Sequence, residues 1–206
     1  MHTISRSPLL PALCALACSG MAVSGAHAVD SWDHGLWLGF QSLPTEFESE
    51  VSGDFSGSNE DDLDSAGRLA LGWRGRAPGQ TAFVVSAGLA FTVEEYEDTD
   101  VTGTGLVVEP GVSWHFNGGF ELDLVGVFGA GVSTLDSGSF EEDGTYGEFG
   151  VMIRPAYQHP EGFRIYADLG YMSRSQEWEI EESGISFDQT LDTSGFAGGL
   201  GIGFMF

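Results

Sequence analysis

The sequence has 206 residues, 42% of them hydrophobic, with 31 Asp and Glu against 7 Lys and Arg and a formal net charge of −24. This excess of acid excludes a nucleic-acid partner, because binding to a phosphate backbone relies on Lys and Arg. Ordinary hydrophobic content beside such acidity indicates that acidic and apolar residues occupy different segments.

Residues 1–28 form the first predicted element, a secretory signal peptide. Arg6 is followed by an apolar, Ala-rich stretch and by Ala26-His27-Ala28, an A-x-A cleavage site. A second interpretation is a lipoprotein signal that is cut before Cys18. Cys14 and Cys18 are the only cysteines, so the mature chain would have no disulfide. It would keep six Arg against 31 acidic residues, a formal charge of −25.

Eight segments with period-two alternation follow the signal peptide, and such alternation predicts strands with two different faces. Most have a length close to the ~9–11 residues that a tilted strand needs to cross a bilayer. After residue 28 no apolar run is long enough for a transmembrane helix. The predicted strands are Gly35–Leu43, Arg68–Arg76, Thr81–Val93, Gly105–Phe116, Phe120–Thr134, Gly147–Tyr157, Phe163–Ser173 and Gly195–Phe206.

The two faces of these strands differ in chemistry. One is uniformly apolar and uncharged, whereas the other holds glycines together with charges of both signs. This pattern favours a barrel with lipid outside and a narrow polar lumen, where an unpaired charge is costly and Arg–carboxylate pairing is expected. The predicted lumen charge cluster is Arg68, Arg74, Glu109, Asp123, Glu148, Arg154, Arg164 and Asp168. Whether it forms a polar plug or a gated ion path stays open at this point.

Long and short connections alternate along the chain. The short ones, 77–80, 117–119 and 159–162, have turn chemistry. The long ones, 44–67, 94–104, 135–146 and 174–194, carry most of the acid. This arrangement predicts periplasmic turns on one side and acidic extracellular loops on the other. We further expect the strands of the first and fourth loops to continue beyond the membrane as a protruding sheet.

Two prolines conflict with these strands. Pro110 and Pro155 lie inside predicted segments, where proline removes a hydrogen bond of the ladder. A bulge, a local kink or an earlier strand end is therefore expected at each. The turn at 158–162 predicts that Arg154 lies opposite Tyr166 and diagonal to Asp168.

Residues that could perform catalysis are few. Ser113 and His115 share a face, and Glu121 is expected across the hairpin from His115. No nucleophile elbow or oxyanion motif accompanies them, so the sequence predicts no enzyme and no cofactor. Carboxylate clusters such as Asp61, Asp62 and Asp64 offer ligands for divalent cations, but the chain has no twelve-residue calcium loop.

The signal peptide, the strand number, the alternating loops and the C-terminal series Leu200, Ile202, Phe204 and Phe206 carry a resemblance. The chain resembles the small eight-stranded outer-membrane barrels of the OmpA/OmpX/OmpW type. The resemblance implies an all-β, transmembrane, antiparallel up-and-down barrel over residues 29–206 in the outer membrane of a Gram-negative cell, with no periplasmic domain. It also implies Phe204 and Phe206 as the signal to the barrel-assembly machinery, contact with outer-membrane lipid and lipopolysaccharide, and a monomer.

The predicted function is non-enzymatic: a structural role at the envelope surface, with ion or small-solute passage left open. Two alternatives stay beside it. One is surface adhesion or partner binding through the acidic protruding loops. The other is a barrel enzyme that modifies lipids.

Overall fold

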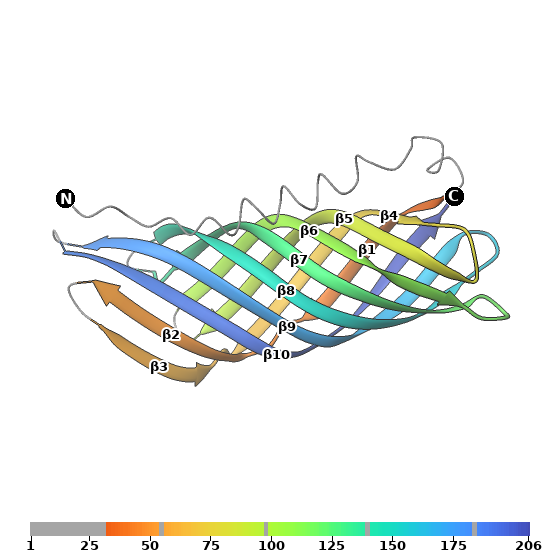
Figure 1. The fold of residues 1–206 in the computed structure, drawn as a ribbon. Coiled ribbons are helices and arrows are strands. Elements are labelled where there is room, and N and C mark those ends of the chain that lie inside the picture. The colour runs from red at the N-terminus through yellow and green to blue at the C-terminus, as the bar shows by residue number, and fades with distance from the viewer. Residues whose placement is uncertain (1–31, 54–55, 97–98, 139–140, 183–184) are drawn as a thin grey trace. The chain divides into compact units, whose positions relative to one another are not determined.

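The computed structural model describes residues 32–53, 56–96, 99–138, 141–182 and 185–206, and these form an all-β unit (Figure 1). The predicted signal peptide and the alternative cleavage at Cys18 lie outside the described residues. No helix among the described residues is long and apolar enough to cross a membrane. The strands are β1 (Asp33–Ser42), β2 (Glu46–Gly53), β3 (Gly57–Asp62), β4 (Ser65–Arg76), β5 (Thr81–Tyr96), β6 (Thr99–His115), β7 (Phe120–Asp136), β8 (Glu141–Gln158), β9 (Phe163–Glu182) and β10 (Ile185–Met205).

Eight of these strands close into a barrel. β1 and β4 to β10 follow one another in an antiparallel order, and β10 pairs again with β1, from Gly35 opposite Met205 to Ser42 opposite Gly198. Closure pairs the backbone N–H and C=O groups of the first and last strands. Without it these groups would face hydrocarbon, where no water could hydrogen-bond to them. The predicted eight-stranded antiparallel up-and-down barrel is confirmed. We call the end with the connections 77–80, 116–119 and 159–162 the turn end, and the opposite end the loop end.

The first long connection contains a hairpin, β2–β3. β2 pairs with the outer part of β10, from Phe47 opposite Thr193 to Gly53 opposite Phe187. β3 pairs with β2, so the sheet has ten strands in all (Figure 1). Together with the long β9–β10 hairpin, this confirms that the first and fourth loops extend as a sheet.

The second and third long connections differ from the prediction. β5 continues to Tyr96 and β6 begins at Thr99, while β7 reaches Asp136 and β8 begins at Glu141. The segments 94–104 and 135–146, predicted as loops, are therefore mostly strand. Their outward residues are polar because water, not lipid, surrounds them. In the sequence, a paired strand with polar outward residues resembles a loop.

Neither proline ends its strand. Between β6 and β7 the ladder runs to Val108 opposite Phe128 and resumes at Gly111 opposite Val125, in the same register. β8 and β9 skip two residues in the same way around Pro155. The expected bulge or early strand end is therefore wrong. Because hydrogen bonds of a central strand point alternately to its two neighbours, a proline interrupts only one ladder, and Pro110 still lies opposite Val85 of β5.

The predicted register of β8 and β9 is also wrong, by two residues. Ala156, not Arg154, lies opposite Tyr166. The turn is displaced by one residue towards the C-terminus, since Gln158 pairs with Arg164. Arg154 is thereby brought level with Asp168, the residue to which it was expected to lie diagonally.

The outer surface of the barrel carries an apolar band. On β9 the outward series runs from Phe163 at the turn end through Ile165 and Leu169 to Tyr171, and each of these side chains is exposed. Aromatic residues mark both edges of the band, as they do at the two membrane interfaces. Exposed aromatic residues are Phe83, Phe116, Phe120, Phe163, Phe204 and Phe206 towards the turn end, and Phe40, Phe91, Phe128, Phe149, Tyr171 and Phe196 towards the loop end.

Beyond the band, the chemistry of the two faces is exchanged. On β9, Glu177 and Glu179 point outward, whereas Trp178 and Ile180 point inward and are buried. Below them the inward residues of the same strand are Arg164, Tyr166 and Asp168. The exchange reflects the surrounding medium. Within the band apolar side chains point outward to lipid, whereas at the loop end, which water surrounds, they point inward. The second apolar cluster, here called the loop-end core, comprises Leu43, Phe47, Leu63, Ala66, Val101, Leu135, Trp178, Ile180 and Leu191.

Candidate functional site: an ionic lumen

Every arginine after residue 31 lies inside the barrel. The most exposed of the six, Arg76, is only 8% exposed, and the chain contains no Lys. Among the exposed carboxylates of the described chain, Asp33 pairs with Arg76, and the outer surface has no exposed Arg or Lys. The six inward arginines are Arg68, Arg74, Arg76, Arg154, Arg164 and Arg174.

A first series of ion pairs, here called the upper ladder, begins next to the loop-end core. Glu94 accepts hydrogen bonds from Arg174 and Gln176. Arg174 and Arg68 share Glu148, at N–O distances of 3.0 and 2.5 Å. The ladder then passes through Glu109, which lies 3.7 Å from Arg68 and 2.9 Å from Arg154, and ends at Asp168, 2.6 Å from Arg154. Gln41 donates the last hydrogen bond to Asp168, at 2.8 Å.

A second series, here called the lower ladder, lies towards the turn end. Asp123 is shared by Arg74, at 2.8 Å, and Arg164, at 2.7 Å. Arg164 also binds Glu121 at 3.0 Å, and Glu121 lies 2.5 Å from His115. The pairing of His115 with Glu121 across the hairpin, as expected from the sequence, is confirmed. Arg68, Arg154 and Arg174 of the upper ladder each bridge carboxylates from two different strands, a geometry that suits the planar guanidinium. In the lower ladder Arg164 binds two carboxylates of β7, one of which also binds Arg74 of β4.

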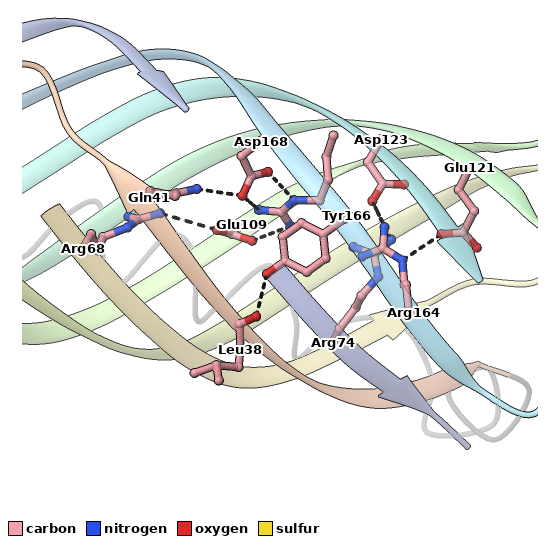
Figure 2. Close-up of polar contacts among 11 residues, drawn as sticks. Leu38, Gln41, Arg68, Arg74, Glu109, Glu121, Asp123, Arg164, Tyr166 and Asp168 are labelled. Carbon is pink, nitrogen blue, oxygen red and sulfur yellow. Dashed lines mark hydrogen bonds and ion pairs between the residues drawn. The ribbon is translucent and has the colours of Figure 1, made fainter. Parts of the chain in front are cut away.

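Tyr166 joins the two ladders (Figure 2). Its ring centre lies 4.6 Å from Cζ of Arg154 and 5.1 Å from Cζ of Arg164, so it is stacked against one arginine of each series. Its hydroxyl donates to the carbonyl oxygen of Leu38 at 3.4 Å. The ring needs glycine opposite it, because a Cβ added at Gly201 would lie 2.1 Å from its Cζ.

We expect Gly201→Ala to lower the free energy of unfolding by about 1–3 kcal/mol, the usual cost of overpacking. The Tyr166 ring is held by two arginines and cannot move away without weakening both stacked contacts. Urea unfolding of the barrel in lipid vesicles, followed by tryptophan fluorescence, measures the effect. Gly147→Ala is the matched control, since a Cβ there meets nothing within 4 Å. Equal unfolding midpoints for the two variants would contradict the role given to Tyr166.

All eight residues of the predicted lumen charge cluster lie in these two ladders. Sequence reasoning left five Asp, Glu, Arg or Gln members out of the cluster: Gln41, Glu94, Glu121, Arg174 and Gln176. Glu94 and Arg174 each lie one residue beyond a predicted strand end, at Val93 and Ser173. Continued alternation across those ends was the signal that could have included them.

The ladders leave little for acid–base or metal chemistry. Glu121, the acid nearest His115, is also bound by Arg164 and so is held as an ion-pair partner. Within the described ranges, no three His, Cys, Asp or Glu side chains are placed so that they could hold a metal ion. What the arrangement provides is cross-linking, because ion pairs between distant strands tie the barrel wall together from inside.

A closed antiparallel barrel with an apolar outer band, aromatic borders and an ionic lumen defines a small outer-membrane β-barrel, and the outer membrane is its location. Solved structures of similar fold are known. The outer membrane protein OprG of Pseudomonas aeruginosa matches with a TM-score of 0.50 and 14% identity, over 85% of this chain and 96% of that chain. The protease OmpT of Escherichia coli matches at 0.46 and 8%, over 84% and 97%, and Neisserial surface protein A at 0.44 and 13%, over 84% and 97%.

Identity at this level shows the fold alone. No protein-family model matches the sequence, and no curated protein matches it.

Proposed function

We propose that this chain is a non-enzymatic surface barrel whose membrane-spanning lumen is a structural plug, and that it acts through its loop end. The observation that carries the proposal is the continuity of the upper ladder, in which seven charged side chains alternate in sign between Glu94 and Asp168. Ion or small-solute passage, left open by the sequence, is not part of this function.

Barrel size supports a plug. An eight-stranded barrel has an interior that side chains nearly fill. Here that interior holds long side chains at its centre, and Arg68, Glu109, Arg154 and Asp168 are at most 2% exposed. A passing ion would have to separate a guanidinium from two carboxylates at once, which costs several kcal/mol in a medium of low dielectric constant.

The loop end supports the second half of the proposal. It presents the exposed side chains of Glu48, Glu50, Glu60 and Asp61 on the β2–β3 hairpin. β3 is the last strand in the order of the sheet and has β2 as its only paired neighbour among the described strands. A surface with these features suits contacts outside the cell better than transport through the wall.

The proposed partners in the membrane are the barrel-assembly machinery, outer-membrane lipid and lipopolysaccharide. Phe204 and Phe206 are exposed at the turn end, which supports their role as the signal to the assembly machinery. The apolar band supports contact with outer-membrane lipid and lipopolysaccharide, and nothing in the ladders requires a second copy.

Planar-bilayer recording tests the plug. We expect the purified barrel to give no regular current steps in concentrated KCl, because both ladders stay intact. The double variant Glu109→Ala with Arg154→Ala removes facing side chains without changing the net charge, and small steps are expected from it. Regular steps from the unmodified protein, growing with salt concentration, would refute the plug.

A further inference from the structure

A cavity of about 260 Å³ lies within the loop-end core and reaches Glu94, the first member of the upper ladder. We call it the loop-end chamber. Phe47, Val101, Leu135, Trp178 and Leu191 line it, and all five are buried, with 7% exposure or less. They come from β2, β6, β7, β9 and β10, so the chamber is a feature of the assembled barrel end and not of one loop.

Polar residues surround the chamber on its more exposed side. Ser49, Asn59, Thr99 and Gln189 line it, and each is half-buried or exposed. The carboxylate of Glu94 also lines it, but both of its oxygens already accept hydrogen bonds from Arg174 and Gln176. The chamber therefore combines an apolar interior with neutral hydrogen-bonding groups at its border.

The size and lining of the chamber indicate a small molecule as its occupant. A cavity of about 150 Å³ lined by Leu, Ile and Phe stays dry and takes benzene, whereas ordered water needs two to four polar partners. The buried part of the chamber is lined mainly by apolar side chains, and its buried carboxylate, Glu94, already accepts hydrogen bonds at both oxygens, so ordered water would find few partners there. A volume near 260 Å³ is too small for a peptide segment and fits a molecule of one or two fused rings.

Charge selects among such molecules. Exposed carboxylates of Glu48, Asp64, Glu95 and Asp100 lie on the same end of the barrel, and all arginines of the described chain are inside the lumen. An anionic ligand would meet repulsion on approach and no free cation inside the chamber. A cationic ligand would be attracted to the rim but would lose its hydration in an apolar interior.

We propose that the loop-end chamber is a binding site for a small, neutral, aromatic molecule with one hydroxyl or similar polar group. The rings fill the space between Trp178, Leu135 and Val101, and the polar group stays at the border with Ser49 and Thr99. The ligand is held beyond the apolar band and above the upper ladder. The site therefore goes beyond the proposed function, and it stands whether or not the lumen conducts.

Equilibrium dialysis of the full chain in lipid nanodiscs tests the site, with empty nanodiscs correcting for partition into lipid. 2-Naphthol is the neutral probe and 2-naphthoate its anionic counterpart. We expect saturable retention of 2-naphthol and retention of 2-naphthoate that is at least about tenfold weaker, equivalent to ~1.4 kcal/mol. Retention of 2-naphthol no greater than in empty nanodiscs would overturn the proposal, and so would equal retention of the anion.

Two neighbouring residues provide a matched pair of variants. Val101→Trp places an indole in the chamber and is expected to abolish saturable retention of 2-naphthol. Thr102→Trp adds the same side chain to the exposed outer face of β6 and is expected to leave retention unchanged. Equal retention by the two variants would overturn the assignment of the chamber.

If Val101→Trp does not fold, Leu135→Ala tests whether the chamber is the binding site. It enlarges the chamber, so a three-ring neutral probe, 9-phenanthrol, is expected to bind at least about tenfold more tightly than to the unmodified protein. Unchanged or weaker binding of 9-phenanthrol by this variant would overturn the proposal.

Discussion

Arg154→Met is expected to lower the free energy of unfolding of the barrel by about 3–5 kcal/mol. Arg154 is 2% exposed and is the cation shared by Glu109 and Asp168, which are buried as well. Methionine keeps much of the side-chain volume but leaves two carboxylates in the lumen with fewer partners. The cost arises mainly from Asp168, which loses its arginine and keeps only the hydrogen bond from Gln41, while Glu109 keeps the more distant Arg68.

Urea unfolding in lipid vesicles, followed by tryptophan fluorescence, measures this loss. Arg76→Met is the matched control, because Arg76 pairs at 3.1 Å with Asp33, whose side chain is 59% exposed and stays hydrated when the arginine is removed. The other hydrogen bond of Arg76 goes to the carbonyl oxygen of Gly79, so we expect a loss of only about 1–2 kcal/mol. Adding Asp168→Asn to Arg154→Met removes one of the two stranded charges and should restore part of the stability. If Arg154→Met and Arg76→Met unfold at the same urea concentration, the ladders do not stabilise the barrel.

The lumen members could be predicted because a closed sheet allows each side chain only two directions. Once Phe163, Ile165 and Leu169 are assigned to the lipid, Arg164 and Asp168 must point inward. The same parity placed Arg68, Glu109 and Arg154 inside without any knowledge of the partners. Pairing followed from the cost of an isolated buried charge, so it did not depend on the exact register, which was predicted wrongly for Arg154.

Glu94 and Arg174 were missed because the strand ends were placed where the outward residues stop being apolar. The alternation itself does not stop there. Trp178 and Ile180 continue the inward series of β9, with Glu177 and Glu179 outward. A search for period two alone, without requiring that the apolar face be the outer one, would have extended β9 and found the loop-end core together with the end of the upper ladder.

The position of the β2–β3 hairpin could not be predicted from local pattern. Glu50 lies opposite Thr190, far along the chain, and nothing near either residue specifies the other. The stacking of Tyr166 between two arginines depends in the same way on the curvature of the closed barrel and on Gly201 of β10. Contacts of this kind are set by the assembled ring, whereas parity is set by each strand separately.

Ile153→Arg is the second substitution with a large expected effect, a loss of about 2–4 kcal/mol in the free energy of unfolding in vesicles. Ile153 is next to Arg154 on β8 but faces the other way, and the residue is 51% exposed in the middle of the apolar band. An arginine at this position has no carboxylate within the band and must be accommodated by hydrocarbon. The loss measured by urea unfolding therefore reports the medium outside the barrel, as Arg154→Met reports the interior.

Thr145→Arg is the control, eight residues away on the same strand and on the same outer face. It lies opposite Glu177 of β9, beyond the apolar band, so the new cation gains a cross-strand partner in water. We expect a change within about 0.5 kcal/mol, or a small gain in stability. A barrel that loses equal stability from both substitutions would have the same medium along the whole of β8. Because the two sites share strand, face and introduced side chain, the difference between them reports mainly the lipid around residue 153 against the water and the Glu177 carboxylate beside residue 145.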